Sequence, residues 1–263
     1  MCKDCGCSGH HHEHSHHTHE HDHSHGEHTH TLPDGTVYTH SHDEAEKREI
    51  AIGSAILSAN DQLASENRGW FRARKVTAYN LISSPGAGKT TLLVKTLEKL
   101  AAAGIKCAVI VGDQYGDIDA KRMKAACSAV TQIETRSSCH LDAARVQSVL
   151  EEAVPEGTEI LFIENVGNLV CPVAFDLGEK SKIALLSTPE GEEKPLKYPA
   201  LFAAAEMVLL TKCDLESALD WDYLLTLKNI KNVNPNAQTM RISVKTEEGL
   251  DSWIEFLKQD VNK

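Results

Sequence analysis

The stretch Ser83-Ser84-Pro85-Gly86-Ala87-Gly88-Lys89-Thr90 lies between a segment, 76–82, that predicts a β-strand and a segment, 91–103, that predicts an α-helix. It matches the phosphate-binding loop G-x-x-x-x-G-K-[ST] except at its first position, where Ser83 replaces glycine. A glycine-rich turn without a ligand could also follow a strand, but it would need neither the lysine nor the threonine. The stretch therefore predicts a nucleotide phosphate site.

Each residue type in this loop has its own expected role. Gly86 and Gly88 let backbone N–H groups curve around the phosphates, and the start of the helix adds its positive end. Lys89 reaches the β- and γ-phosphates, and Thr90 supplies a hydroxyl to Mg²⁺. Thr91, the next residue, completes the expected set of nucleotide-binding residues in this loop.

Helix and strand signals alternate along the rest of the chain. After a long helix at 43–67, strands are expected at 76–82, 105–111, 132–135, 159–165, 183–187, 207–212 and 238–244. Helices are expected at 91–103, 120–126, 141–153, 200–206, 221–230 and 248–258. This order indicates an α/β fold, a P-loop NTPase with helices on both faces of a mostly parallel sheet. Such sheets bind ligands at the carboxyl ends of their strands.

The base of the nucleotide is read further along the chain. Thr211-Lys212-Cys213-Asp214 resembles the N-K-x-D element of GTPases, and Ile242-Ser243-Val244-Lys245 resembles their S-A-K element. A carboxylate at Asp214 accepts hydrogen bonds from the ring N–H and the exocyclic amine of guanine, whereas adenine presents an acceptor there. Lys212 and Asp214 therefore favour GTP. An aspartate at an ordinary strand end is the alternative, because Thr211 stands where asparagine is commoner.

Two acidic strand ends are expected to complete the chemistry. Asp113 follows the strand at 105–111 and would hold Mg²⁺ or orient the attacking water, with Asp117 and Asp119 as nearby alternatives. Glu164-Asn165-Val166-Gly167 resembles the D-x-x-G element, with Glu for Asp, whose backbone senses the γ-phosphate. The expected catalytic residues are Lys89, Asp113 and Glu164.

Residues 1–42 form an arm of unusual composition. It holds Cys2, Cys5 and Cys7 and every histidine except His140, interleaved with Glu, Asp, Ser and Thr. Thiolates and imidazoles bind nickel, copper and zinc more tightly than magnesium or calcium. An affinity tag would be an unbroken histidine run, and a merely solvated low-complexity arm would not require histidine. We therefore expect a disordered metal-binding arm at 1–42, followed by a GTPase domain at 43–263 that includes an N-terminal helix.

Composition excludes several classes of partner. The formal net charge of -11 and the lack of a basic patch argue against nucleic acid. No apolar run reaches the roughly 18 residues of a membrane span, and the N-terminus lacks the apolar core of a signal peptide. A cytoplasmic protein without a membrane partner is expected. Its scattered cysteines are then thiols in the core or metal ligands rather than disulfides.

Two separate motifs carry further candidate ligands. Cys139-His140 precedes a predicted helix, and Cys171-Pro172 follows the Glu164–Gly167 segment by a few residues. One Cys-His pair and one further Cys are too few ligands for a closed tetrahedral site within one chain, but two copies in a symmetric dimer could complete one. Buried structural cysteines are the alternative.

These motifs together closely resemble those of the nickel-inserting hydrogenase maturation GTPases, the HypB family. The resemblance spans the chain and rests on Cys2-x-x-Cys5-Gly6-Cys7, Ser84-Pro85-Gly86-Ala87-Gly88-Lys89-Thr90, Gly112-Asp113, Cys139-His140-Leu141-Asp142-Ala143, Glu164-Asn165-Val166-Gly167-Asn168-Leu169-Val170-Cys171-Pro172 and Lys212-x-Asp214. The combination is far more specific than any single motif.

The resemblance implies a GTPase of the SIMIBI class, a homodimer when GTP is bound, that delivers nickel for maturation of [NiFe] hydrogenase. Its implied partners are the zinc-containing metallochaperone HypA and the hydrogenase large subunit, and its implied cofactors are GTP, Mg²⁺, Ni²⁺ and Zn²⁺. The implied metal sites are a nickel site at Cys2, Cys5 and Cys7 and a nickel or zinc site at Cys139, His140 and Cys171.

Two alternatives stay open at this point. The urease maturation GTPases share a histidine-rich start and nickel delivery, but they have a Cys-Pro-His motif, whereas Val173 follows Cys171-Pro172 here. They also lack the cysteine cluster at the start of the chain. A nickel storage protein with a vestigial nucleotide site is the second alternative, and the intact Lys89, Thr90 and Asp113 argue against it.

Overall fold

A computed structural model describes residues 27–31, 37–113, 118–136 and 138–261. The chain divides into two compact units, Met1–Ala59 and Asn60–Lys263. The cysteines at positions 2, 5 and 7 and most of the predicted metal-binding arm lie outside the described residues.

The first unit contains a two-stranded antiparallel sheet that the sequence did not predict. β1 (Glu27–Thr31) pairs with β2 (Val37–Ser41), and the paired residues run from Glu27 opposite Ser41 to Thr31 opposite Val37. The histidines of this segment indicate metal binding, but their alternation with β-branched threonine is also compatible with a strand.

α1 (His42–Arg74) continues beyond residue 67, where the sequence predicted its end. Phe71 is buried in the core of the second unit, so the last turns of the helix have packing to stabilise them. Arg72 and Arg74 lie in the last turn, where cations interact favourably with the helix dipole. Lys75 takes a left-handed conformation, φ 58°, and the helix stops.

The second unit is built on a seven-stranded parallel sheet, as the sequence predicts. Its order is β5-β4-β6-β3-β7-β8-β9, which puts the strand before the phosphate loop near the centre. The strands are β3 (Thr77–Ser83), β4 (Cys107–Asp113), β5 (Val130–Glu134), β6 (Ile160–Glu164), β7 (Ser181–Ser187), β8 (Ala205–Thr211) and β9 (Gln238–Ile242).

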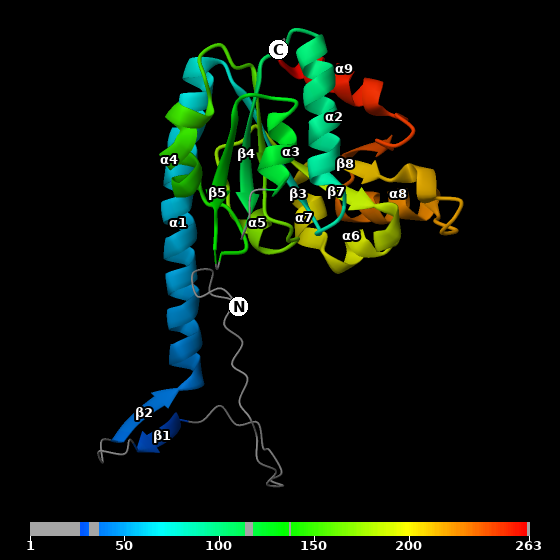
Figure 1. The fold of residues 1–263 in the computed structure, drawn as a ribbon. Coiled ribbons are helices and arrows are strands. Elements are labelled where there is room, and N and C mark those ends of the chain that lie inside the picture. Colours follow the sequence, from blue (N-terminus) through cyan, green and yellow to red (C-terminus); the bar gives the residue numbers. More distant parts are fainter. Residues whose placement is uncertain (1–26, 32–36, 114–117, 137, 262–263) are drawn as a thin grey trace. The chain divides into compact units, whose positions relative to one another are not determined.

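Helices cover both faces of this sheet (Figure 1). The main ones are α2 (Lys89–Ala102), α3 (Ile118–Lys124), α4 (Ala143–Ala153), α7 (Pro199–Ala204), α8 (Tyr223–Val233) and α9 (Leu250–Val261). Tyr79 and Leu81 of β3 pack with α2, α3 and α9 on one face. Ala78 packs with α1 and α4, and Ile82 with α7 and α8, on the other. The alternation of side chains along β3 thus builds both cores.

Four short elements and several boundaries differ from the sequence expectation. α5 (Cys171–Ala174), α6 (Lys194–Lys197) and the 3₁₀ turns Thr188–Glu190 and Cys213–Leu215 were too short to give a periodic signal. The helix expected at 200–206 ends at Ala204, because the next two residues already belong to β8. α4 begins at Ala143 rather than at 141, since the Asp142 side chain accepts a hydrogen bond from Arg145 N and caps the helix.

Candidate nucleotide and metal site

The phosphate loop has the backbone its sequence predicts. Gly86 and Gly88 take positive φ angles of 76° and 100°, a conformation that disfavours side chains, and Gly88 caps α2. Lys89 Nζ donates a 2.8 Å hydrogen bond to the hydroxyl of Ser83, the residue that replaces the first glycine of the motif. Ser83 therefore holds the lysine across the loop.

A cleft of about 570 Å³ opens at the carboxyl ends of the central strands, where the sequence predicted the ligand. The loop and the ends of β4 and β6 form its walls. Its lining residues include the predicted Gly86, Gly88, Lys89, Thr90, Thr91, Asp113, Glu164 and Lys212, together with Asp119, Arg122 and Asn165.

Glu164 stands at the end of β6, between Leu81 of β3 and Val111 of β4. It is 4 % exposed, and its Oε1 accepts a 2.8 Å hydrogen bond from the Thr90 hydroxyl. Its Oε2 has no hydrogen-bond partner among the described residues. Burial raises the pKa of Glu164 to about 7, although the Lys89 ammonium and the Thr90 hydrogen bond oppose that rise.

The charges at Lys89 and Glu164 depend on each other. Burial lowers the pKa of Lys89, and the neighbouring Glu164 carboxylate is the main opposing influence. The Thr90 hydroxyl and the Asp113 carboxyl line the same cleft and suit a hard cation such as Mg²⁺. Glu164 Oε2, a buried carboxylate oxygen without a hydrogen-bond partner among the described residues, suits a water beside that cation. The residues present therefore fit the cation that nucleotide binding requires.

Arg122 is a residue of the cleft that the sequence reasoning missed. It lies on α3, its Nη2 donates a 3.3 Å hydrogen bond to the hydroxyl of Thr91, and its Nη1 lies 3.6 Å from Asp119 Oδ1. The spacing of Asp119 and Arg122 on a helix was the available signal. Asp117, an alternative to Asp113, lies outside the described residues, and Asp119 lines the cleft.

The two predicted base-reading elements come together. Ser243 donates a 2.7 Å hydrogen bond to Asp214 Oδ1, and Lys245 Nζ lies 4.0 Å from Asp214 Oδ2. Lys212 Nζ donates to the carbonyl oxygen of Gly86 at 2.7 Å. The Thr211 hydroxyl, where asparagine is commoner, donates to the carbonyl oxygen of Ala87 at 2.7 Å. Threonine at this position thus still ties the base element to the phosphate loop.

Cys139, His140 and Cys171 also come together, although α4 and β6 separate them along the chain. Their ligand atoms all lie within 4.8 Å of one another. His140 is buried and stacks on Phe175 with a centroid distance of 3.9 Å, while both thiols are half-buried. Two sulfurs and an imidazole nitrogen suit Ni²⁺ or Zn²⁺ and leave room for a further ligand.

The other described cysteines lie outside this group. Burial raises the pKa of Cys107 to about 12 and that of Cys213 to about 11, and it raises the pKa of Cys127 as well. Thiols that stay protonated are poor metal ligands, so these three behave as core residues.

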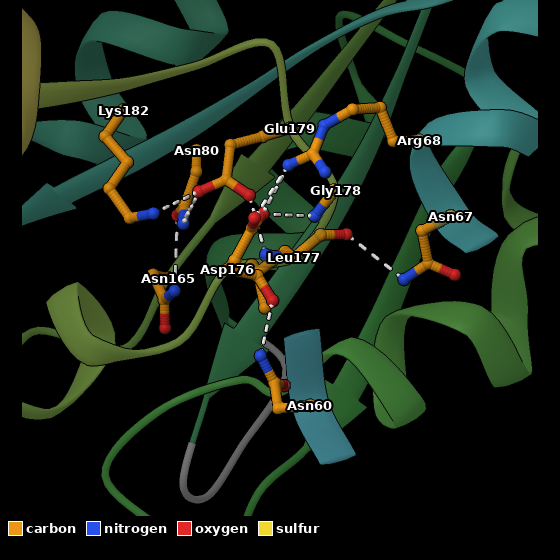
Figure 2. Close-up of polar contacts among 10 residues, drawn as sticks. All are labelled: Asn60, Asn67, Arg68, Asn80, Asn165, Asp176, Leu177, Gly178, Glu179 and Lys182. Atoms are coloured by element: carbon orange, nitrogen blue, oxygen red, sulfur yellow. Dashed lines mark hydrogen bonds and ion pairs between the residues drawn. The ribbon is translucent and has the colours of Figure 1, made fainter. Parts of the chain in front are cut away.

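Two asparagines of α1 tie together the loops that carry the ligand group, a link that sequence reasoning missed. Asn60 donates from Nδ2 to the Asp176 carbonyl at 2.8 Å and accepts from Ala143 N at 2.9 Å. Asn67 donates from Nδ2 to the carbonyls of Ala143 and Leu177 at 3.0 and 3.1 Å. Figure 2 shows both asparagines reaching toward the Asp176–Leu177 turn. Ala143 lies three residues after His140, and Asp176 directly follows Phe175, the ring on which His140 stacks. The loop that carries His140 and the loop that carries Phe175 are therefore both hydrogen-bonded to α1.

Comparison with known proteins gives the family. Residues 77–241 match the family model described as "CobW/HypB/UreG, nucleotide-binding domain". The chain is 45% identical over 224 residues to the hydrogenase maturation factor HypB of Escherichia coli strain K12, a match that covers 85% of this chain and 77% of that protein.

Solved structures agree. The crystal structure of HypB from Helicobacter pylori in complex with nickel superposes with a TM-score of 0.73 at 33% identity, covering 78% of this chain and 95% of that one. That of the hydrogenase maturation factor HypB from Archaeoglobus fulgidus gives 0.72 at 32% identity, with 78% and 99% coverage. Among the described residues, no helix is both long and apolar enough to cross a membrane. The phosphate loop, the ligand group and these matches together place the chain in the HypB family of hydrogenase maturation factors, with a nucleotide-binding domain of the P-loop GTPase type.

Proposed function

We propose that the protein is a GTP-hydrolysing nickel metallochaperone that delivers nickel for the maturation of [NiFe] hydrogenase. One observation carries the proposal most directly. The segment that begins at Glu164, in the wall of the nucleotide cleft, ends at Cys171, a member of the ligand group. Nucleotide and metal would thus share one stretch of chain.

The chain's own residues divide the nucleotide chemistry among them. The backbone at Gly86 and Gly88 and the ammonium of Lys89 would bind the phosphates, while Lys212 and Asp214 would select guanine. Thr90 and Asp113 would hold Mg²⁺, which neutralises the charge that develops on the transferred phosphoryl group. Glu164, with a pKa near neutrality and an oxygen free of partners among the described residues, would orient the attacking water.

Nickel is the cargo in this account. Cys139, His140 and Cys171 supply three ligands, so a fourth position is left for a second copy of the chain or for another ligand. GTP binding would set a homodimer and the ligand geometry, and hydrolysis would relax the loops and release nickel. The release would serve the hydrogenase large subunit in the cytoplasm, with HypA as a partner. Zn²⁺ suits the same ligands and would compete for them.

The arm has a separate part in the proposal. Cys2, Cys5 and Cys7 would form a discrete nickel site, and the histidines from position 10 to position 42 would hold further ions in reserve. Regulated transfer would belong to the group at Cys139, His140 and Cys171, since the segment from Glu164 to Cys171 links that group to the nucleotide cleft.

The test is the affinity of the ligand group for Ni²⁺ in two nucleotide states. The full chain would be titrated with Ni²⁺ in the presence of GDP and of a nonhydrolysable GTP analogue. The proposal expects affinities that differ at least about fivefold, the lower end of ordinary coupling between sites. Equal affinities would contradict it.

Two other functions make different forecasts. A storage protein with a vestigial nucleotide site would turn over no GTP, whereas the Lys89–Ser83 and Thr90–Glu164 hydrogen bonds favour a working site. A turnover assay with Lys89→Ala as the control separates the two. A urease maturation factor is disfavoured by Val173 after Cys171-Pro172, and the assay is nickel transfer to apo-hydrogenase against apo-urease.

A further inference from the structure

We propose that Asn165 is a positioning residue that transmits the nucleotide state to the ligand group, and that it acts through Leu141. The inference rests on the proposed function and names the contact by which that function is regulated. Neither residue belongs to the ligand group, and in the sequence Asn165 is part of the segment Glu164-Asn165-Val166-Gly167 that resembles the D-x-x-G element.

Asn165 joins the nucleotide cleft to the loop that carries His140. It follows Glu164 directly, it is fully buried, and it lies in the wall of the cleft. Its side-chain Oδ1 accepts a 3.1 Å hydrogen bond from the backbone N–H of Leu141, the residue after His140. The same oxygen accepts from Val166 N at 3.0 Å. One oxygen atom thus binds the backbone N–H of Val166, beside the cleft, and that of Leu141, beside the ligand group.

Leu141 also packs against the end of β4, next to Asp113. A Cβ atom added to Gly112, which precedes Asp113, would lie 2.7 Å from Leu141 Cγ. Any side chain at position 112 would therefore displace Leu141. Since Leu141 is fully buried and packed densely, it has no empty space into which to move independently. The backbone of β4 and the side chain of Asn165 together determine where Leu141, and hence His140, lies.

A series of buried polar contacts, shown in Figure 2, fixes the orientation of the Asn165 amide on the side away from Leu141. Its Nδ2 donates to Asn80 Oδ1 at 3.2 Å, and Asn80 Nδ2 donates to Glu179 Oε1 at 3.1 Å. Glu179 in turn pairs with Lys182 at 2.9 Å. Because its donor and acceptor sides are both engaged, the amide of Asn165 cannot turn over without breaking hydrogen bonds in a buried site.

The far end of the same loop is fixed by different residues. Asn60 and Asn67 of α1 bind both backbone groups of Ala143, two residues beyond Leu141. The cleft therefore controls one end of the short segment from His140 to Ala143, and α1 holds the other. A shift of Glu164 and Asn165 on nucleotide exchange would move Leu141 against a fixed point and alter the position of His140.

The experiment measures nickel affinity in the full chain with Cys2, Cys5 and Cys7 replaced by serine. In this parent, absorption from thiolate-to-nickel charge transfer reports Cys139 and Cys171, and a chelator buffer fixes the free Ni²⁺ despite the histidines of the arm. The dissociation constant is measured with GDP and with a nonhydrolysable GTP analogue. Asn165→Ala should keep the absorption band, but the ratio of the two constants should fall to within about twofold of one, from at least about fivefold in the parent.

Two further variants sharpen the result. Gly112→Ala leaves Asn165 intact but displaces Leu141, and it should reduce the ratio in the same way, so the test survives if Asn165→Ala does not fold. Asn234→Ala is the matched control. Asn234 is also an asparagine whose side-chain Nδ2 donates to backbone carbonyls, those of Phe202, Ala203 and Ala205, and its replacement should leave the ratio unchanged.

The outcomes separate this inference from the function on which it rests. If the parent shows equal affinities in the two nucleotide states, the proposed coupling itself is wrong, and the role of Asn165 falls with it. If the parent is coupled and Asn165→Ala and Gly112→Ala keep the full ratio, only the role of Asn165 and Leu141 is overturned.

Discussion

The hydroxyl of Thr90 donates a 2.8 Å hydrogen bond to Oε1 of Glu164, and this contact joins the phosphate loop to the end of β6. In the proposed mechanism the same two side chains serve Mg²⁺ and the attacking water. Glu164 is buried and its second oxygen has no hydrogen-bond partner among the described residues. A buried, charged carboxylate with an unpartnered oxygen lowers the free energy of unfolding when no ligand is bound, so stability should depend on the pH.

Glu164→Gln should stabilise the nucleotide-free protein more at pH 8 than at pH 5. Burial raises the pKa of Glu164 from its ordinary value of 4.5 to about 7, so the folded state binds this proton more tightly than the unfolded state. The stability that protonated Glu164 contributes to the folded state is therefore fully present below pH 4.5, and it is lost as the pH rises through 7. At roughly 1.4 kcal/mol per pKa unit, the loss is at most about 3.5 kcal/mol.

Urea unfolding of both proteins at pH 5 and pH 8, without Mg²⁺ or nucleotide, measures this difference. Glu152→Gln, at an exposed carboxyl, provides the control. A difference in free energy of unfolding between Glu164→Gln and the natural protein that does not change with pH would contradict the assignment.

Lys89→Ala should lower kcat for GTP at least about 100-fold, because the variant loses a positive charge aimed at the phosphates. The fold should survive, since Lys89 makes its side-chain hydrogen bond to Ser83 within the loop. Lys99→Ala is the control. Lys99 lies on the same helix and pairs with Asp251 at the surface, so its replacement should leave turnover unchanged. Steady-state phosphate release measures both, and turnover by Lys89→Ala near that of the natural protein would refute the role of the lysine.

Asp214→Asn should weaken GDP binding at least about 100-fold, because it removes an acceptor that guanine's N–H groups require. The side chain already sits in place, held by Ser243. Fluorescent-nucleotide titration gives the dissociation constants, and the exposed Asp220→Asn is the control. Unchanged GDP affinity in Asp214→Asn would mean that another residue reads the base.

Cys171→Ser should lower nickel affinity at the ligand group at least about 10-fold, because one of its two thiolates is lost. Cys127→Ser should have no effect, since Cys127 is a core thiol that donates to the Cys107 carbonyl. Both variants are compared in a chain lacking the three cysteines of the arm, by chelator competition. Equal losses in the two variants would indicate a general loss of structure rather than of a ligand.

Removal of residues 1–42 should lower the number of Ni²⁺ ions bound per chain and leave GTP turnover intact. The arm carries every histidine but His140, whereas the nucleotide cleft is lined entirely by residues from 85 onward. Equilibrium dialysis gives the number of ions, and phosphate release gives turnover. A loss of turnover would contradict the division of labour between arm and domain.

Much of the fold and of the candidate site was predictable, because the signals were local. The short phosphate-loop motif predicts the strand before it and the helix after it. Apolar runs predict the strands whose ends form the cleft. The grouping of Cys139-His140 with Cys171 followed from the rule that parallel strands bring their carboxyl ends to one edge.

What the sequence could not show depends on contacts between distant residues. Arg122 reaches Thr91 from a helix whose surface pattern looks ordinary, and Asn60 meets Asp176 across 116 positions of sequence. A buried asparagine reads as a loop or surface residue until its partners are known. The end of α1 was missed for the same reason, since the packing of Phe71 prolongs the helix.

The most direct test of the account loads the protein with Ni²⁺ and GTP and follows phosphate formation and nickel capture by a chelator in the same single turnover. The account predicts that nickel leaves at the rate at which phosphate forms, and that both stop with a nonhydrolysable GTP analogue. Release of nickel at the same rate with the analogue would contradict the claim that hydrolysis governs metal transfer.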